Sequence, residues 1–327
     1  MSNDKQLINR IETVKAGEFD ALAMDMYRFQ AAELPVYRDF HQALRRSPED
    51  VQHINDIPFL PISFFKSHRV AGSAESAFVF ESSGTTGMTP SRHFVADISL
   101  YGRYALEGFR KFYGDPSEWT ILALLPSYLE RGNSSLVYMV QMLMEESGKT
   151  ENGFYLHQFA ELADTLRRLS AEGRKVLLFG VTFALLDFAE QFPMSLKGCT
   201  LIETGGMKGR KEEWTRQQVY AFLHERWPDV NIHSEYGMTE LLSQAYAVEP
   251  GIYHPTRLMK ALVRDINDPL QSSNSGAGVL NIIDLANLHS CSFIATEDIG
   301  RVYEDGAFEV LGRLDFAALR GCSLLAL

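Results

Sequence analysis

The sequence has few cysteines and no excess of positive charge. Its 327 residues include three cysteines, Cys199, Cys291 and Cys322, which are too few and too scattered for a disulfide framework or a zinc site. The formal net charge of −11 disfavours a nucleic-acid or anionic-membrane surface, although a local basic site for ATP is compatible with it. Unpaired cysteines of this kind fit a reducing compartment best.

Signals for membrane insertion and export are also lacking. No uninterrupted apolar run reaches the ~18–20 residues of a membrane span. The polar start, Met1 to Lys5, has no apolar region typical of a signal peptide, so we expect a cytoplasmic protein. The composition is that of an ordinary globular chain, with length for one large domain or one large and one small domain.

Apolar runs of strand length alternate with helical patterns through the middle of the chain. Strands are expected at residues 120–125, 175–180, 199–203 and 229–234, and helices at 97–113, 133–147, 158–171, 182–191 and 211–226. Asp97 is the expected N-cap of the first of these helices. The alternation predicts an α/β core of parallel sheet with helices on both faces.

The two ends of the chain have a different pattern. Residues 3–56 are predicted to be helical, with a third helix beginning near Pro35, and the proline-interrupted residues 57–66 are predicted to be extended and buried. Beyond about residue 260, short β-like runs separated by turns predict a small β-rich subdomain. We therefore divide the chain into residues 1–258, the helical segment and α/β core, and residues 259–327, the β-rich subdomain and a tail.

A Gly-, Ser- and Thr-rich stretch follows the apolar run at residues 77–80. Glycine allows close backbone approach, and free N–H and hydroxyl donors suit phosphate oxygens. The stretch is not a Walker A loop, because no Gly-Lys-Ser/Thr follows at the required spacing. A solvated turn is the alternative. The candidate phosphate contacts are Ser82, Ser83, Gly84, Thr85, Thr86 and Gly87.

Further polar clusters offer the other parts of a nucleotide site. Tyr236 can stack on a purine, and Glu240 can hold Mg²⁺ against phosphate oxygens. Asp298 offers a carboxylate to a ribose diol, and Arg313 a guanidinium to the same ribose or a phosphate. The structural alternatives are a helix N-cap at Thr239 and an ion pair between Asp298 and Arg313.

The order and spacing of these clusters resemble the adenylate-forming superfamily, which includes acyl-CoA synthetases, peptide-synthetase adenylation domains and firefly-type luciferases. Residues 83–87 resemble its phosphate loop, residues 236–240 its adenine and magnesium motif, and residues 312–315 with 319–321 the segment leading into its hinge. The resemblance implies Mg²⁺ at Glu240 and ATP contacts from residues 82–87 and from Gly205, Gly206, Tyr236, Gly237, Thr239, Asp298 and Arg313. The implied reaction is attack of a carboxylate on the α-phosphate of ATP, giving an acyl-adenylate and pyrophosphate.

The sequence departs from the superfamily pattern in two places. The chain stops at Leu327, so we expect the small C-terminal domain that carries a catalytic lysine to be absent, and Pro90-Ser91-Arg92 stands where a Pro-Lys is usual. With these departures the chain resembles one branch of the superfamily, the acyl-protein synthetases of bacterial bioluminescence. These enzymes pass the acyl group to their own cysteine near the C-terminus. This resemblance implies Cys322 as the acyl acceptor. Lys66, Arg92 or His93 would then supply the positive charge of the missing lysine.

The acid is expected near Phe179, Phe183 and Met238, because apolar side chains suit a fatty or other apolar acyl group. The acyl group would then pass from Cys322 to a protein partner or a small thiol. Three rival functions stay open. They are an acyl-CoA or acyl-carrier-protein ligase with Cys322 incidental, a non-catalytic acyl or nucleotide binder, and a subunit of a larger reductase complex. Cys199 and Cys291 are expected in the core.

Overall fold

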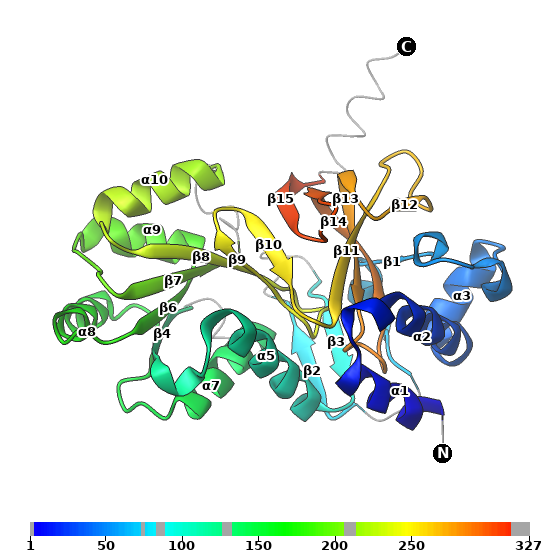
Figure 1. Ribbon diagram of the computed structural model, residues 1–327, viewed down its shortest axis with the longest axis horizontal. Helices are drawn as coiled ribbons and strands as arrows, with labels where there is room; N and C mark the ends of the chain where they lie inside the picture. Colours follow the sequence, from blue (N-terminus) through cyan, green and yellow to red (C-terminus); the bar gives the residue numbers. More distant parts are fainter. Residues whose placement is uncertain (1–2, 73–75, 83–88, 126–132, 206–213, 315–327) are drawn as a thin grey trace, which may run out of the picture.

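The computed structural model describes residues 3–72, 76–82, 89–125, 133–205 and 214–314, and a 13-stranded mixed sheet runs through it (Figure 1). One half of this sheet is parallel. Its strands, in spatial order, are β5 (Gly153–Tyr155), β4 (Thr120–Leu124), β6 (Val176–Val181), β7 (Cys199–Thr204) and β8 (Asn231–Tyr236). Every residue of β4 and β6 is buried, which explains why both strands are continuous apolar runs.

Helices cover both faces of the parallel half, as predicted. On one face lie α5 (Ile98–Tyr113) and α7 (Ser135–Ser147), and on the other lie α8 (Phe159–Ala171), α9 (Thr182–Gln191) and α10 (Arg216–Arg226) (Figure 1). The Asp97 side chain caps α5 by accepting the Ser99 N–H at 2.9 Å, as expected. Gly180 lets α9 approach β6, because a Cβ there would collide with Leu185.

The second half of the sheet is antiparallel and comes from the later part of the chain. It consists of β9 (Ala245–Glu249), β10 (Ile252–Pro255), β11 (Met259–Arg264), β12 (Ser272–Ser273), β13 (Gly276–Asp284), β14 (Phe293–Val302) and β15 (Phe308–Arg313), with β1 (Leu60–Pro61) parallel to β14. The predicted β-rich segment is confirmed as strands. The division at residue 258 stays a prediction.

A narrow seam lies within the antiparallel half, where the hairpin of β9 and β10, which pairs with β8 of the parallel half, meets β15. β10 and β15 pair through a single residue pair, Tyr253 with Phe308. The Tyr236 ring at the end of β8 packs edge-on against both, with centroid distances of 5.8 and 5.2 Å. Aromatic side chains from three strands thus join the antiparallel half to the parallel half.

The N-terminal helices pack on the antiparallel half. They are α1 (Asn3–Thr13), α2 (Phe19–Glu33) and α3 (Pro35–Ala43), and the third begins at Pro35 as predicted. The buried Gln30 side chain donates to the Asn287 and Leu288 carbonyls and accepts the Ser292 N–H. Tyr37 stacks on Phe293 at 6.1 Å.

Three predicted boundaries and one local structure need correction. Residues 57–66 are extended only as far as β1; the chain then forms the short helix α4 (Phe64–Ser67), because no proline follows Pro61 and helical hydrogen bonds become possible. The helix expected from about residue 211 begins at Arg216, where Thr215 caps it. β8 continues to Tyr236, two residues beyond its expected end, and the hairpin of β9 and β10 was not predicted.

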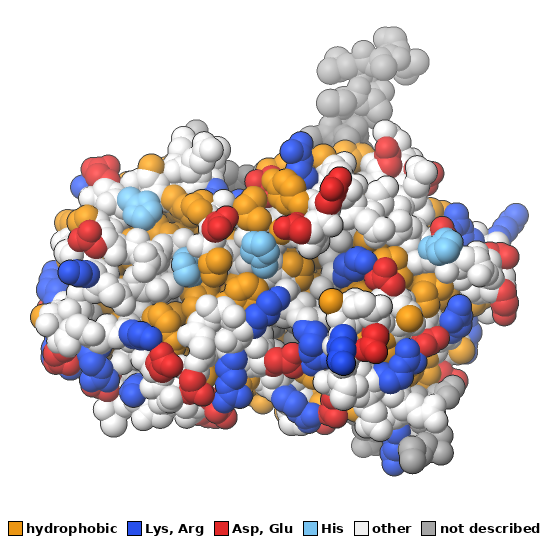
Figure 2. All heavy atoms as spheres, in the orientation of Figure 1, with side chains coloured by type: hydrophobic (Ala, Val, Ile, Leu, Met, Phe, Trp, Pro, Cys, Tyr) orange, Lys and Arg blue, Asp and Glu red, His pale blue; other side chains and the backbone are white. Residues whose placement is uncertain are grey.

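Acidic and basic side chains are intermixed over the face shown in Figure 2. Ion pairs between distant segments include Arg257 with Glu107 and Lys260 with Asp20, in each of which the acidic side chain is exposed and the basic one half-buried. Cys199 and Cys291 are buried in the core, as predicted, and burial raises the pKa of each thiol to about 12. Within the described ranges, no helix has the length and apolar character needed to cross a bilayer.

Candidate functional site

The two ends of the predicted phosphate loop are held by a β-hairpin of β2 (Phe78–Glu81) and β3 (Arg92–Val95). Beyond the last strand pair, the Ser82 N–H donates to the Ser91 carbonyl at 3.0 Å, and the Ser91 N–H donates to Ser82 Oγ at 2.9 Å. The predicted contacts Ser83, Gly84, Thr85, Thr86 and Gly87 lie outside the described residues. The hairpin therefore fixes where the loop leaves and rejoins the sheet.

His93 ties this hairpin to the segment after β8. Its ring is fully buried, packs edge-on against Phe65 at 5.7 Å, and donates from Nδ1 to the Thr239 carbonyl at 2.8 Å. Burial lowers the pKa of His93 to about 4, so the ring is neutral at neutral pH. A neutral imidazole carries no positive charge, which leaves Lys66 and Arg92 as the predicted cations of this group.

Glu240 is the predicted metal ligand, and its side chain is only 5% exposed. Burial raises the pKa of this carboxyl, while a hydrogen bond from Ser91 and the charges of Arg313 and Lys66 oppose the rise. Three predicted site residues from distant parts of the chain, Lys66, Glu240 and Arg313, thus interact electrostatically.

The fit of Glu240 to Mg²⁺ depends on what else could ligate the ion. Among the residues that the structure describes, no group of three or more His, Cys, Asp or Glu side chains could hold a metal. Mg²⁺ is commonly held by one or two carboxylates together with phosphate oxygens. A single carboxylate next to Ser91, at the end of the predicted phosphate loop, fits that pattern, so Glu240 would hold the ion only jointly with a bound phosphate.

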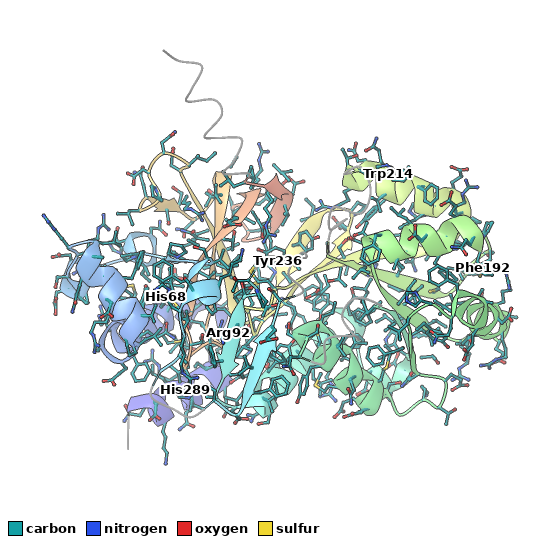
Figure 3. All side chains as sticks on the ribbon, turned by 180° about the vertical axis from the view of Figure 1, so that it is seen from behind. His68, Arg92, Phe192, Trp214, Tyr236 and His289 are labelled. Carbon is teal, nitrogen blue, oxygen red and sulfur yellow. The ribbon has the colours of Figure 1, made fainter. Side chains whose placement is uncertain are left out.

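Three predicted site residues, Tyr236, Asp298 and Arg313, come together next to the seam between β10 and β15. The Tyr236 hydroxyl donates to Asp298 Oδ2 at 2.9 Å, and Arg313 Nε lies 3.6 Å from Asp298 Oδ1. Asp298 and Arg313 are directly opposite each other on β14 and β15. Figure 3 shows Tyr236 and Arg92 near the middle of the molecule, between the parallel half and the N-terminal helices.

The backbone after Tyr236 is held by the turn that follows β13. Asp284 is fully buried and accepts the N–H groups of Leu242 and Ser243 at 2.7 and 3.0 Å, and the Ser243 hydroxyl at 2.6 Å. The Asn287 amide donates to the Glu240 carbonyl at 2.9 Å. Burial raises the pKa of Asp284 and these donors oppose the rise. Sequence reasoning missed both residues, since they lie far along the chain from the motif they support.

Two carboxyls at the ends of β7 and β8, the half-buried Glu203 and the buried Glu235, were also missed. Glu203 accepts hydrogen bonds from Thr182 and Ser234, and Glu235 accepts one from Thr204 at 2.7 Å. Burial raises the pKa of both, that of Glu235 to about 7, with the charge of Glu203 adding to the rise at Glu235. The signal was present in the sequence as a glutamate beside a hydroxyl residue at the end of two adjacent apolar strands.

Thr182 also donates to the carbonyl of Gly205, which is one of the glycines predicted to contact the nucleotide. Gly205 has φ +74°, which favours glycine, while Gly206 lies outside the described residues. Gly237 adjoins Glu235 so closely that a Cβ would collide with the carboxyl. Both glycines therefore have a local structural reason for being glycine.

The remaining predicted residues are less tightly grouped. Arg92 is exposed, with its guanidinium 5.8 Å from the centre of the Phe94 ring. Phe179 and Phe183 are buried in β6 and α9, and Met238 is half-buried in the turn after β8. Cys322 lies outside the described residues, so its role as acyl acceptor stays a prediction.

No protein-family model matches the chain, and no curated protein matches its sequence. Solved structures share its fold. A 2-hydroxyisobutyryl-CoA ligase in an open conformation, in complex with 2-HIB-AMP and CoA, is 12% identical with a TM-score of 0.61 over 94% of this chain and 78% of the ligase. The same ligase in its postadenylation state gives a TM-score of 0.64 over 94% and 70%.

A third structure, the ATP-bound RpMatB-BxBclM chimera B3, is 14% identical with a TM-score of 0.52, covering 74% of this chain and 49% of the chimera. Identities this low establish the fold and not the reaction. The chain shares with these solved structures the fold described above, a mixed sheet with helices on both faces.

Proposed function

We propose that this protein is an adenylate-forming ligase that activates a carboxylic acid with Mg-ATP. The observation that carries the proposal is the meeting of four segments around one place: the Ser82–Ser91 hairpin end, the Tyr236–Glu240 segment, Asp298 and Arg313. The fold shared with CoA ligases supports it.

In this proposal, different residues bind different parts of the nucleotide. The loop at residues 82–87, whose two ends the hairpin holds, would donate to phosphate oxygens, and Glu240 would share Mg²⁺ with them. Asp298 would accept from the ribose hydroxyls beside Tyr236. Bound Mg²⁺ would neutralise developing charge on the phosphates. Lys66 and Arg313 add positive charge at Glu240.

The proposed first step joins the acid to AMP. A carboxylate oxygen attacks the α-phosphorus of ATP, a phosphorus–oxygen bond forms, and the bond to the β-phosphate breaks with release of pyrophosphate. Arg92 and Lys66 would stabilise the charge in the transition state. The acyl group would lie toward Phe179 of β6, Phe183 of α9 and Met238 in the turn after β8, because apolar side chains suit an apolar acyl group.

In the proposed second step a thiol replaces AMP. The thiolate of Cys322 attacks the acyl carbon, a thioester forms, and the carbon–oxygen bond to AMP breaks; the thiol proton passes to solvent. The acyl group then moves to a protein partner or a small thiol. We propose the acyl-protein synthetase type on the strength of the sequence resemblance around Cys322.

A second candidate is direct transfer to coenzyme A or an acyl-carrier protein. It is favoured by one observation, since the structure with a TM-score of 0.61 is a CoA ligase in complex with an acyl-AMP and CoA. In this case Cys322 takes no part. Cys322→Ser would then transfer acyl groups to added CoA at the wild-type rate.

The test is acid-dependent ATP–pyrophosphate exchange with fatty, aryl and amino acids, followed by the intact mass of the protein. We expect exchange with at least one acid, and an acyl adduct that disappears in Cys322→Ser while exchange persists. Exchange without an adduct would overturn the Cys322 step alone. ATP binding without exchange would indicate a binding protein, and exchange only with a co-purified partner would indicate a subunit of a larger complex.

A further inference from the structure

The Tyr236 hydroxyl is hydrogen-bonded to a side chain of the candidate site. It donates to Asp298 Oδ2 at 2.9 Å, and the Asp298 side chain is only 13% exposed. A hydrogen bond from a neutral donor to a carboxylate is stronger than one between neutral groups. The ring of Tyr236 is therefore held at its polar end as well as along its edges.

The tyrosine is itself fixed from two sides. Tyr253 on β10 and Phe308 on β15 pack against its ring, and those two rings stack on each other at 5.4 Å. Tyr236 is 8% exposed, and burial together with the Asp298 charge raises its pKa well above the ordinary value. The hydroxyl therefore keeps its proton at neutral pH and can donate it to Asp298.

The other oxygen of Asp298 has a different environment. Arg313 Nε lies 3.6 Å from Oδ1, and the Arg313 side chain is 66% exposed. This contact is long and solvent-screened, so it constrains the carboxylate weakly. The Asp298 N–H donates to Thr296 Oγ1 at 3.1 Å, which fixes the backbone but not the side-chain torsions. The firm restraint on the carboxylate plane comes from Tyr236.

We propose that Tyr236 is a positioning residue whose hydroxyl presets the Asp298 carboxylate to accept both hydroxyls of a nucleotide ribose. The inference rests on the proposed function, since it assumes that Asp298 meets the ribose. It adds that the hydroxyl of the tyrosine, and not only its ring, contributes to nucleotide selection. With Oδ2 held by Tyr236, Oδ1 is the oxygen that lies next to the exposed side chain of Arg313.

The proposal separates two effects that a tyrosine beside a nucleotide can have. Contact of the ring with a base does not depend on the sugar. The effect of orienting Asp298 does depend on the sugar, because an oriented carboxylate strengthens binding only when ribose hydroxyls are present to donate to it. Comparing ATP with dideoxy-ATP, which lacks both hydroxyls, in wild type and variant therefore isolates the coupling between the protein hydroxyl and the sugar hydroxyls.

The experiment measures equilibrium binding of Mg-ATP and Mg-dideoxy-ATP by titration calorimetry. The variants are Tyr236→Phe, Asp298→Asn and the matched control Tyr253→Phe, which removes a hydroxyl from the same aromatic cluster without touching Asp298. Melting temperatures confirm that each variant is folded. We expect Tyr236→Phe to weaken ATP binding by up to roughly tenfold, because an Asp298 carboxylate without this hydrogen bond must be ordered when the ribose binds, and to weaken dideoxy-ATP binding less than about threefold.

The outcomes distinguish this inference from the proposed function. Equal weakening of ATP and dideoxy-ATP by Tyr236→Phe, or no weakening of either, would overturn the positioning role while leaving ATP binding in place. The same selective loss in Tyr253→Phe would also overturn it, because the effect would then belong to the aromatic packing. Wild-type protein that does not bind ATP, or binding unaffected by Asp298→Asn, would overturn the ribose assignment and this inference together.

Discussion

Replacing Glu235 by glutamine is expected to stabilise the protein at alkaline pH and to leave it almost unchanged in acid. Glu235 is 7% exposed, and the Thr204 hydroxyl donates to one of its oxygens. Burial, with a smaller effect from Glu203, raises the pKa of Glu235 from 4.5 to about 7. Glutamine has nearly the same shape, keeps an oxygen for Thr204 and carries no charge at any pH.

The magnitude follows from the shifted equilibrium. A group whose pKa is raised on folding binds more protons in the folded than in the unfolded state between the two values, so stability falls as pH rises through about 4.5 to 7. Over the whole pKa shift the free energy of unfolding falls by about 3 kcal/mol, because a shift of one pKa unit corresponds to ~1.4 kcal/mol. We therefore expect Glu235→Gln to raise the free energy of unfolding by up to about 3 kcal/mol at about pH 8 and by almost nothing near pH 4.

Urea unfolding of wild type and variant at about pH 5 and about pH 8 provides the assay. Glu249→Gln is the matched control, because Glu249 is exposed on β9 and its replacement should change little at either pH. A Glu235→Gln variant that is destabilised at alkaline pH, or changed equally at both, would refute the account of a carboxyl strained by burial.

Three further predictions concern the supports of the site. Asp284→Asn should lower the free energy of unfolding by about 2–3 kcal/mol, because an amide N–H would face donors that now reach a carboxylate, whereas the exposed Asp268→Asn should be near neutral in urea unfolding. The folded pKa of His93 is depressed from 6.5 to about 4, so stability due to this residue falls as pH decreases through that window. His93→Gln should therefore lose less stability than wild type on acidification, and a larger loss would contradict a buried neutral ring. Arg92→Ala should lower the rate of adenylation at least roughly tenfold while changing ATP affinity little, and an unchanged single-turnover rate would exclude Arg92 from charge stabilisation.

Local features of the fold were predictable because neighbouring residues determine them. The N-cap Asp97 and the spacing of buried residues in α5 define that helix, and the buried run of β6 defines a central strand. The error at residues 57–66 shows the limit of this reasoning. Prolines indicate where a helix cannot form, but not that one begins immediately after the last of them.

The contacts that hold the candidate site in place join residues far apart in the sequence, so the sequence alone does not predict them. His93 reaches Thr239 across 146 residues, and Gln30 reaches Ser292 across 262. The motif residues themselves were recognisable, because their chemical types match parts of a nucleotide. Glu235 and Asp284 were not, because a buried carboxyl becomes conspicuous only when its surroundings are known.

The central claim is that a carboxylate attacks the α-phosphate of ATP. It is tested most directly by supplying an acid labelled with oxygen-18 in its carboxyl group and analysing the products by mass spectrometry. The account predicts pyrophosphate without label and AMP that carries one oxygen-18, since the acyl–oxygen bond breaks when a thiol or water takes the acyl group. Label in inorganic phosphate with formation of ADP, or unlabelled AMP, would contradict it.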